Sequence, residues 1–173
     1  MGGDKIIKME KDSTIKIYLA APIVNISELQ RSEINQIKYC LEKFKTFDNY
    51  NISIYDPKDH GVPNAWGISM QEWCRCIFAL DVVAIDNSDW IIVCDYGRKG
   101  TAGTAWECGY AFGKDKKVLI IQMNKEAIDY SVMMRGCSAN YCTFEEFCQA
   151  DYDTFINKIL VERGRLPQTE ILN

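Results

Sequence analysis

Short, nearly continuous apolar runs alternate with segments of helical periodicity along most of the chain. The runs predict buried strands at 15–20, 52–55, 89–94 and 117–121 and near 140–143. Apolar residues three or four positions apart predict helices between them, at 26–46, 68–85, within 99–114 and from 144 to 161. Strands that alternate with helices indicate an α/β fold, with a parallel sheet covered on both faces.

Two connections lack either pattern. The loop DPKDHGVPNAWG after the second strand is rich in turn residues, and the segment around MMRG is expected to be irregular. We expect a single domain over 15–162, preceded by a flexible segment, 1–14, and followed by a loosely held tail, 163–173.

Composition narrows the range of partners. The net charge of −4 argues against a nucleic-acid polymer, because proteins that bind one concentrate Lys and Arg on one face. No apolar run approaches the ~20 residues of a membrane span, so no membrane partner is expected. The first fourteen residues lack the apolar core of a signal peptide, and Ile6 stands where a myristoylation signal has Ser or Thr.

The eight cysteines form no CxxC pair, and His60 is the only histidine. Several cysteines, including Cys94 and Cys108, fall on predicted core positions. Buried free thiols in a reducing compartment explain this pattern better than disulfides or a metal site, so we expect a cytoplasmic protein.

Two carboxylates lie on predicted helices that flank the third strand. Glu107 follows a small-residue turn, KGTAGTA, where amides at the start of a helix can hold phosphate or sugar. Asp81 lies in the apolar stripe of the preceding helix, where a carboxylate is costly unless it is paired or neutralised. Each has a structural alternative: a capping box between Thr104 and Glu107, and a bond from Asp81 to nearby backbone.

Ligands bind beyond the carboxyl ends of the strands in such sheets, at 18–22, 56–66 and 95–103 here. Both carboxylates can therefore point into one cleft above the third strand. Two carboxyls in a cleft tend to separate their pKa values, so that one is ionised and one holds a proton. A nucleophile and an acid of this kind are the requirements of retaining glycosidic chemistry.

In its ordered motifs the sequence resembles the nucleoside 2-deoxyribosyltransferase family, over about residues 15 to 147. The motifs are KIYLAAP, Asp81 eight residues before Asp89, GTAWECGYAFGK and KVLII. The resemblance implies a flavodoxin-like (Rossmann-like), doubly wound sheet of five parallel strands. It also implies an enzyme without metal or cofactor that acts on a small nucleoside or nucleotide, and a homo-oligomer, dimer or larger, in which a neighbour completes each site.

The resemblance also implies the roles of individual residues. Glu107 would be the nucleophile that forms a glycosyl-enzyme intermediate, Asp81 would handle the base, and Tyr18 would orient Glu107. A tyrosine at position 18 is also similar to the members that prefer deoxyribose, because its hydroxyl competes with a ribose 2′-OH for space and partners. The structural alternative is an ordinary half-buried tyrosine of the strand. The loop after the first strand would contribute Ala21, where the family often has Gly, and Ile23 to substrate binding.

Two further departures from the residue pattern of the family favour a nucleotide substrate over a nucleoside. Thr101 stands six residues before Glu107, where transferases usually carry an Asp for the 5′-hydroxyl, and Ser131 stands two residues before Met133, where they usually carry Asn. The related nucleoside 5′-monophosphate N-glycosidases carry small hydroxyl residues at both places and hold phosphate with them. A hydroxyl can donate to phosphate, whereas an Asp would repel it.

Several other groups near these positions could take part in substrate binding. Amides around Ala102 and Gly103 would add to a phosphate pocket, and Ser131 and Met133 would reach it from a neighbouring subunit. Trp66, in the loop after the second strand, is the tryptophan best placed to stack on a base, although large aromatics are often core or interface residues. Arg98 and Lys99 either attract phosphate or are solvated loop charges.

Three functions follow from these residues. The first is hydrolysis of the N-glycosidic bond of a 2′-deoxynucleoside 5′-monophosphate, and the second is transfer of deoxyribose between bases. The third is a non-catalytic nucleotide-binding domain, since a fold does not fix a function. The two awkwardly placed carboxylates argue against the third.

Overall fold

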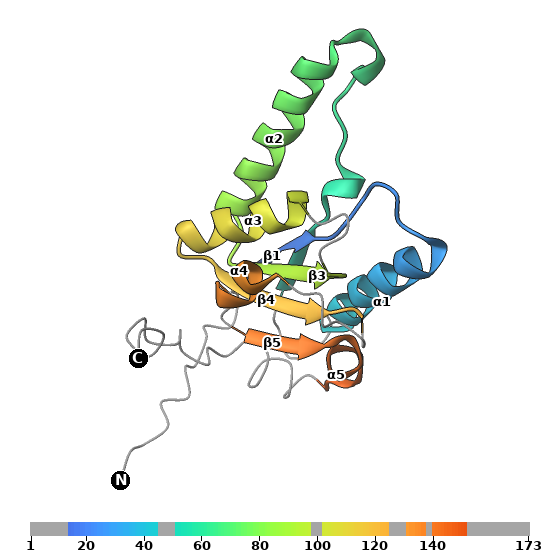
Figure 1. The fold of residues 1–173 in the computed structure, drawn as a ribbon, viewed down its shortest axis with the longest axis vertical. Helices are drawn as coiled ribbons and strands as arrows, with labels where there is room; N and C mark the ends of the chain where they lie inside the picture. Colours follow the sequence, from blue (N-terminus) through green and yellow to red (C-terminus); the bar gives the residue numbers. More distant parts are fainter. Residues whose placement is uncertain (1–13, 45–50, 98–101, 125–130, 138–139, 152–173) are drawn as a thin grey trace.

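Five parallel strands form one sheet in the computed structural model, which describes residues 14–44, 51–97, 102–124, 131–137 and 140–151. The strands are β1 (Thr14–Ala20), β2 (Asn51–Tyr55), β3 (Trp90–Asp95), β4 (Lys117–Gln122) and β5 (Asn140–Thr143). Their order across the sheet is β2-β1-β3-β4-β5, the doubly wound order of flavodoxin-like folds (Figure 1). The predicted fold class is confirmed.

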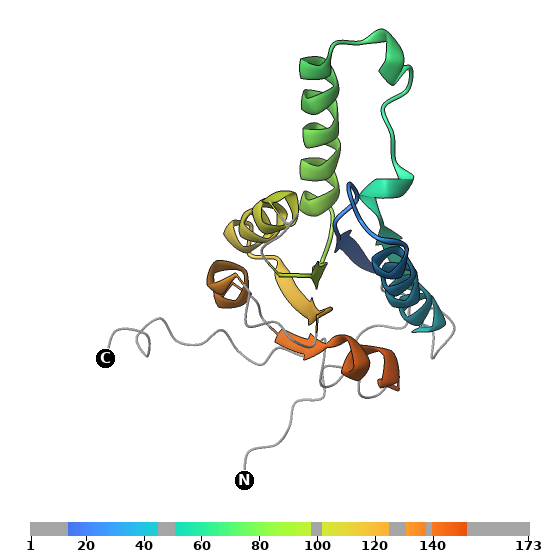
Figure 2. The ribbon, with the colours of Figure 1, turned by 45° about the vertical axis from the view of Figure 1, so that its right-hand side comes forward.

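Helices cover both faces of the sheet. They are α1 (Glu28–Phe44), α2 (Met70–Asp86), α3 (Ala102–Gly113), α4 (Val132–Gly136) and α5 (Phe144–Gln149). α1 and α5 lie on one face, and α3, α4 and the C-terminal end of α2 lie on the other (Figure 2). The loop after β2 contains two short 3-10 helices, η1 (Pro57–Asp59) and η2 (Ala65–Gly67).

Alternation along β1 decides which side chains reach which face. Ile15, Ile17 and Leu19 pack under α1, whereas Tyr18 and Ala20 pack on the side of α3. Successive side chains of a strand point to opposite faces, so this register places the Tyr18 ring beside the helices that carry the predicted carboxylates.

Two predictions of secondary structure are wrong. The segment around MMRG forms the short helix α4, because Ser131 caps it by accepting a hydrogen bond from the Met134 N–H at 3.3 Å. The last helix does not run from 144 to 161: α5 ends at Gln149, where Ala150 takes an extended conformation. The expected flexible ends lie outside the described residues, except Thr14 at the start of β1.

α2 projects beyond the sheet (Figures 1 and 2). Ser69 and Glu72 form a capping box that starts it, and Ile85 is its one buried residue. Its large apolar side chains that remain exposed are Met70, Trp73, Phe78, Leu80 and Val83. No helix in the described part of the chain is both long and apolar enough to cross a membrane.

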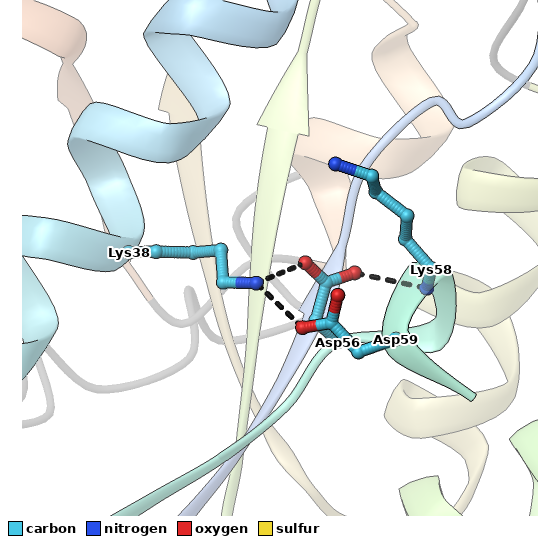
Figure 3. Close-up of polar contacts among 4 residues, drawn as sticks. All are labelled: Lys38, Asp56, Lys58 and Asp59. Atoms are coloured by element: carbon cyan, nitrogen blue, oxygen red, sulfur yellow. Dashed lines mark hydrogen bonds and ion pairs between the residues drawn. The ribbon is translucent and has the colours of Figure 1, made fainter.

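An ion-pair cluster around the buried Asp56 holds α1 to the segment that follows β2 (Figure 3). The Lys38 ammonium lies 2.8 Å from the Asp56 carboxylate and 2.7 Å from that of Asp59. Asp56 is buried and also accepts the Lys58 backbone N–H, which caps η1. Burial opposes the charge on Lys38, but the hydrogen bonds to the two carboxylates outweigh it and raise the pKa of Lys38. The cluster therefore fixes where the long loop leaves the sheet.

Replacing Lys38 should destabilise the fold because Asp56 would stay buried without its cation. Lys38→Met should lower the free energy of unfolding, measured by urea denaturation, by about 1–3 kcal/mol. Lys58→Met is the matched control, since only the backbone of Lys58 contacts Asp56, and it should change stability by less than about 0.5 kcal/mol. Equal losses in both variants would contradict the assigned role of Lys38.

Candidate active site

A hydrogen bond across the core joins Tyr18 of β1 to Glu107 of α3. The Tyr18 hydroxyl donates to Glu107 Oε1 at 2.7 Å, and the Tyr18 side chain is fully buried. Thr104 lies inside α3 and is not its N-cap, so the alternative capping box between Thr104 and Glu107 does not form. The Glu107 carboxyl is thus held by a side chain from the sheet.

The surroundings of Glu107 favour a carboxyl that exchanges its proton near neutral pH. Burial raises its pKa, the hydrogen bond from Tyr18 lowers it and the charge of Asp81 raises it, which together bring the pKa of Glu107 to about 7. Burial also raises the pKa of Asp81. Burial and then the charge of Glu107 raise the pKa of Tyr18 far above its usual range, so its hydroxyl keeps its proton.

Asp81 and Glu107 line one cleft between α2 and α3, with a volume of about 300 Å³. The lining residues are Trp73, Cys74, Ile77, Phe78, Asp81, Gly103, Trp106 and Glu107. Phe78 and Trp106 contact each other across the two helices, with ring centroids 5.0 Å apart. The cleft therefore combines two carboxyls with aromatic and aliphatic walls, as small-molecule sites usually do.

Two aromatic residues that the sequence did not single out as site residues extend the Tyr18 ring outward. The Tyr55 ring stacks on Tyr18 with centroids 5.6 Å apart, and His60 stacks on Tyr55 at 4.1 Å with the rings 1° from parallel. Burial and then the charge of Asp81 raise the pKa of Tyr55, which indicates that this stack lies near the carboxyls. Tyr55 ends β2, and His60 lies in the loop that follows it. The rule that ligands bind beyond the carboxyl ends of parallel strands could therefore have pointed to both residues.

The remaining predicted residues lie in different places. Gly103 lines the cleft, and Ala102 is exposed at the start of α3. Ser131 is half-buried as the cap of α4, and Met133 is 79% exposed. Thr101, Arg98 and Lys99 lie outside the described residues.

Two loop predictions fall away from the cleft. The side chain of Trp66 is fully exposed on η2 and does not line the cleft; Trp73 and Trp106 do. Ala21 and Ile23 line a separate small hollow beside Asp56. The structure therefore brings Tyr18, Asp81, Glu107 and Gly103 together within one chain and leaves Trp66, Ala21 and Ile23 outside the cleft.

The arrangement suits a reaction at a sugar carbon. An ionised Glu107, oriented by Tyr18, can act as a carboxylate nucleophile, and Asp81, with its raised pKa, can hold a proton beside it. Two carboxyls in a partly desolvated cleft are what the cleavage of a glycosidic bond would need.

Solved structures resemble this fold over most of its length. A 2-deoxyribosyltransferase from Bacillus psychrosaccharolyticus superposes with a TM-score of 0.64 at 23% identity, covering 80% of this chain and 94% of that one. A conserved protein from Enterococcus faecalis V583 gives 0.59 at 17% identity, covering 79% and 96%. The CMP N-glycosidase BcmB of Clostridium botulinum gives 0.49 at 20% identity, covering 78% and 96%. At these identities the likeness to the first two structures shows the fold.

The sequence carries the family assignment. None of the functionally curated proteins matches the chain at a significant level. The sequence profile of the nucleoside 2-deoxyribosyltransferase family, however, matches residues 17–157, which include Tyr18, Asp81 and Glu107. Because this match spans most of the chain and contains the whole cleft, the protein belongs to the nucleoside 2-deoxyribosyltransferase family of glycosyl-transferring enzymes.

Proposed function

We propose that the protein hydrolyses the N-glycosidic bond of 2′-deoxynucleoside 5′-monophosphates, giving free base and deoxyribose 5-phosphate. The observation that carries the proposal is the partly buried Tyr18–Glu107 hydrogen bond in a site whose cleft also contains Asp81. A non-catalytic nucleotide-binding domain would have no use for two carboxyls whose burial raises both pKa values.

The reaction has two steps. The Glu107 carboxylate attacks the anomeric carbon, the bond from that carbon to the base breaks, and the base leaves with a proton supplied or shared by Asp81. A water molecule then attacks the same carbon, gives a proton back to Asp81, and releases the sugar phosphate and the Glu107 carboxylate. Tyr18 keeps Glu107 oriented in both steps and occupies space near a ribose 2′-OH, which favours deoxyribose.

Hydroxyls and amides would hold the 5′-phosphate. Amides at the start of α3 and the Thr101 hydroxyl lie in sequence just ahead of Glu107. The Ser131 oxygen accepts the Met134 N–H, so its own hydrogen can still be donated to a phosphate in a neighbouring subunit. Neither Thr101 nor Ser131 adds a negative charge to the pocket, which supports a monophosphate over a nucleoside.

Transfer of deoxyribose to a second base is the alternative, and it uses the same first step. The observation that favours it is the family match itself, because the family is named for transferases. The two reactions differ only in whether water or a base resolves the glycosyl-Glu107 intermediate.

A second copy of the chain would complete the site. The protein would work in a reducing cytoplasm, which keeps its cysteines as free thiols. In the single chain the cleft wall is open to solvent, since Trp73 is 38% exposed and Trp106 is 43% exposed. The apolar side chains along α2 continue this exposed surface. A symmetric dimer would bury both and bring Ser131 and Met133 of one copy toward the other.

Glu107 should be indispensable for turnover. Glu107→Gln should lower kcat by at least ~10³ because no nucleophile remains.

In the wild type, kcat/KM should rise with pH through about 7 as Glu107 ionises. Tyr18→Phe removes the hydrogen bond that favours the carboxylate, so this limb should move to higher pH by about one to two units.

Tyr96→Phe is the matched control for Tyr18→Phe. The Tyr96 hydroxyl is also partly buried, but it donates to Glu33 at 2.8 Å on the opposite face of the sheet. Its pH–rate profile should match that of the wild type. An unchanged limb in Tyr18→Phe would contradict the role of Tyr18, and near-normal turnover in Glu107→Gln would contradict the mechanism.

The substrate class should be decided by a panel of deoxynucleosides and their 5′-monophosphates, with and without a labelled second base. We expect release of base from monophosphates at a rate ~10³-fold above that from nucleosides, since two charge-assisted hydrogen bonds contribute roughly 1.5–3 kcal/mol each. Thr101→Asp should weaken monophosphate turnover by repulsion and spare nucleosides. Ser131→Ala should have a smaller effect. Incorporation of the labelled base would identify a transferase.

The oligomer should depend on the exposed face of α2. Light scattering after size exclusion should show a dimer or larger assembly for the wild type. Val83→Glu, which places a charge among the exposed apolar side chains of α2 but outside the cleft lining, should shift the assembly toward monomer and lower kcat/KM. The control is Tyr39→Glu on α1, exposed on the opposite face of the sheet, which should leave the assembly intact. A monomeric wild type at full activity would refute the shared site.

A further inference from the structure

Two cysteines lie directly behind the proposed nucleophile. Cys108 follows Glu107 on α3 and is fully buried, and Cys137 caps the C-terminal end of α4 and is half-buried. Their sulfur atoms are 3.0 Å apart. No step of the proposed reaction uses either thiol.

We propose that Cys108 and Cys137 are an oxidisable dithiol, which a hydroperoxide converts into a disulfide linking α3 to α4. The geometry carries this inference. A disulfide needs its sulfurs at about 2.05 Å, so closing the pair requires about 1 Å of movement between two side chains that already touch.

The two thiols have the properties of an attacking and a resolving cysteine. Cys137 is the one within reach of solvent, and the hydrogen bond from Cys108 lowers its pKa, which favours the thiolate that attacks a peroxide. The hydrogen bond to Cys137 and burial raise the pKa of Cys108, so it keeps its proton until the second step. While it is protonated, the Cys137 thiol also donates to the Met134 carbonyl oxygen at 3.1 Å, which holds its sulfur beside Cys108.

The chemistry balances with a hydroperoxide as the oxidant. The Cys137 thiolate attacks one peroxide oxygen, the O–O bond breaks, and Cys137 becomes a sulfenic acid as an alcohol or water leaves. The Cys108 sulfur then attacks the Cys137 sulfur, the S–O bond breaks, and hydroxide leaves as water with the proton of Cys108. Two thiols are oxidised to one disulfide and one hydroperoxide is reduced.

Other cysteines are less suited to this reaction. Burial raises the pKa of Cys94, Cys142 and Cys148, which keeps these thiols protonated. Cys74 and Cys76 are exposed but lie two positions apart on α2, and side chains at that spacing do not face each other on a helix.

The disulfide would act on the neighbouring site, an effect that rests on the proposed function. Cys108 is bonded through the backbone to Glu107, and Cys137 ends the helix that Ser131 begins. A shift of about 1 Å at a reacting group can cost ~10²-fold in rate. We therefore expect the oxidised enzyme to turn over about 10²-fold more slowly and to recover in dithiothreitol.

The cross-link itself is tested by mass spectrometry. The full chain, freed of reductant, is treated with about one equivalent of hydrogen peroxide, blocked with N-ethylmaleimide in denaturant so that the buried Cys108 is accessible, and digested. We expect a peptide pair joined through Cys108 and Cys137 that dithiothreitol separates. Cys137→Ser should abolish it, whereas Cys148→Ser, which changes another half-buried thiol, should retain it. Blocked Cys108 and Cys137 after peroxide treatment would overturn the proposal.

Activity provides a second, separate readout. Turnover of the wild type, but not of Cys137→Ser, should fall on peroxide treatment. A cross-linked enzyme with full turnover would refute the effect on the site, although the modification would stand. If the reduced protein releases no base from any substrate, the proposed function fails, and the cross-link still decides whether the dithiol is oxidised.

Discussion

The hydrogen bond from Tyr18 to Glu107 is the contact on which the site depends. A carboxyl placed against the core of a protein is costly, and this one is held by a single phenol that comes from the central part of the sheet. Burial moves the pKa of Glu107 to about 7, so that the group is poised between its acid and its base. The same burial that makes the residue useful would make it destabilising without Tyr18.

The parallel sheet determines that these side chains meet. β1 and β3 are neighbours, so the helices that precede and follow β3 cover the face to which Tyr18 points. α2 contributes Asp81 and α3 contributes Glu107 to one cleft. On the other face, the Lys38 cluster fixes the start of the loop after β2, which brings the stacked rings of Tyr55 and His60 to the Tyr18 ring.

In the single chain the cleft between α2 and α3 is open to solvent. Its aromatic wall is exposed, and the apolar surface continues along α2 where no other element of the described chain covers it. A second copy would remove this surface from water and exclude solvent from the carboxyls, which strengthens their electrostatic effect. Cys108 and Cys137 lie behind the same helix, so oxidation there would act on the backbone that positions Glu107.

The sequence by itself determined the fold class, the strands and the two carboxylates, because periodicity records burial and a charged residue in an apolar stripe is visible without coordinates. Periodicity did not show the helix at α4, which is only five residues long, or the end of α5 at Gln149, where Ala150 takes an extended conformation. Only the tertiary structure showed that Glu107 bonds Tyr18 instead of its own helix, and that Trp73 and Trp106 line the cleft where Trp66 does not. The reason is physical: pairing between elements depends on their positions in space, which separation along the chain does not encode.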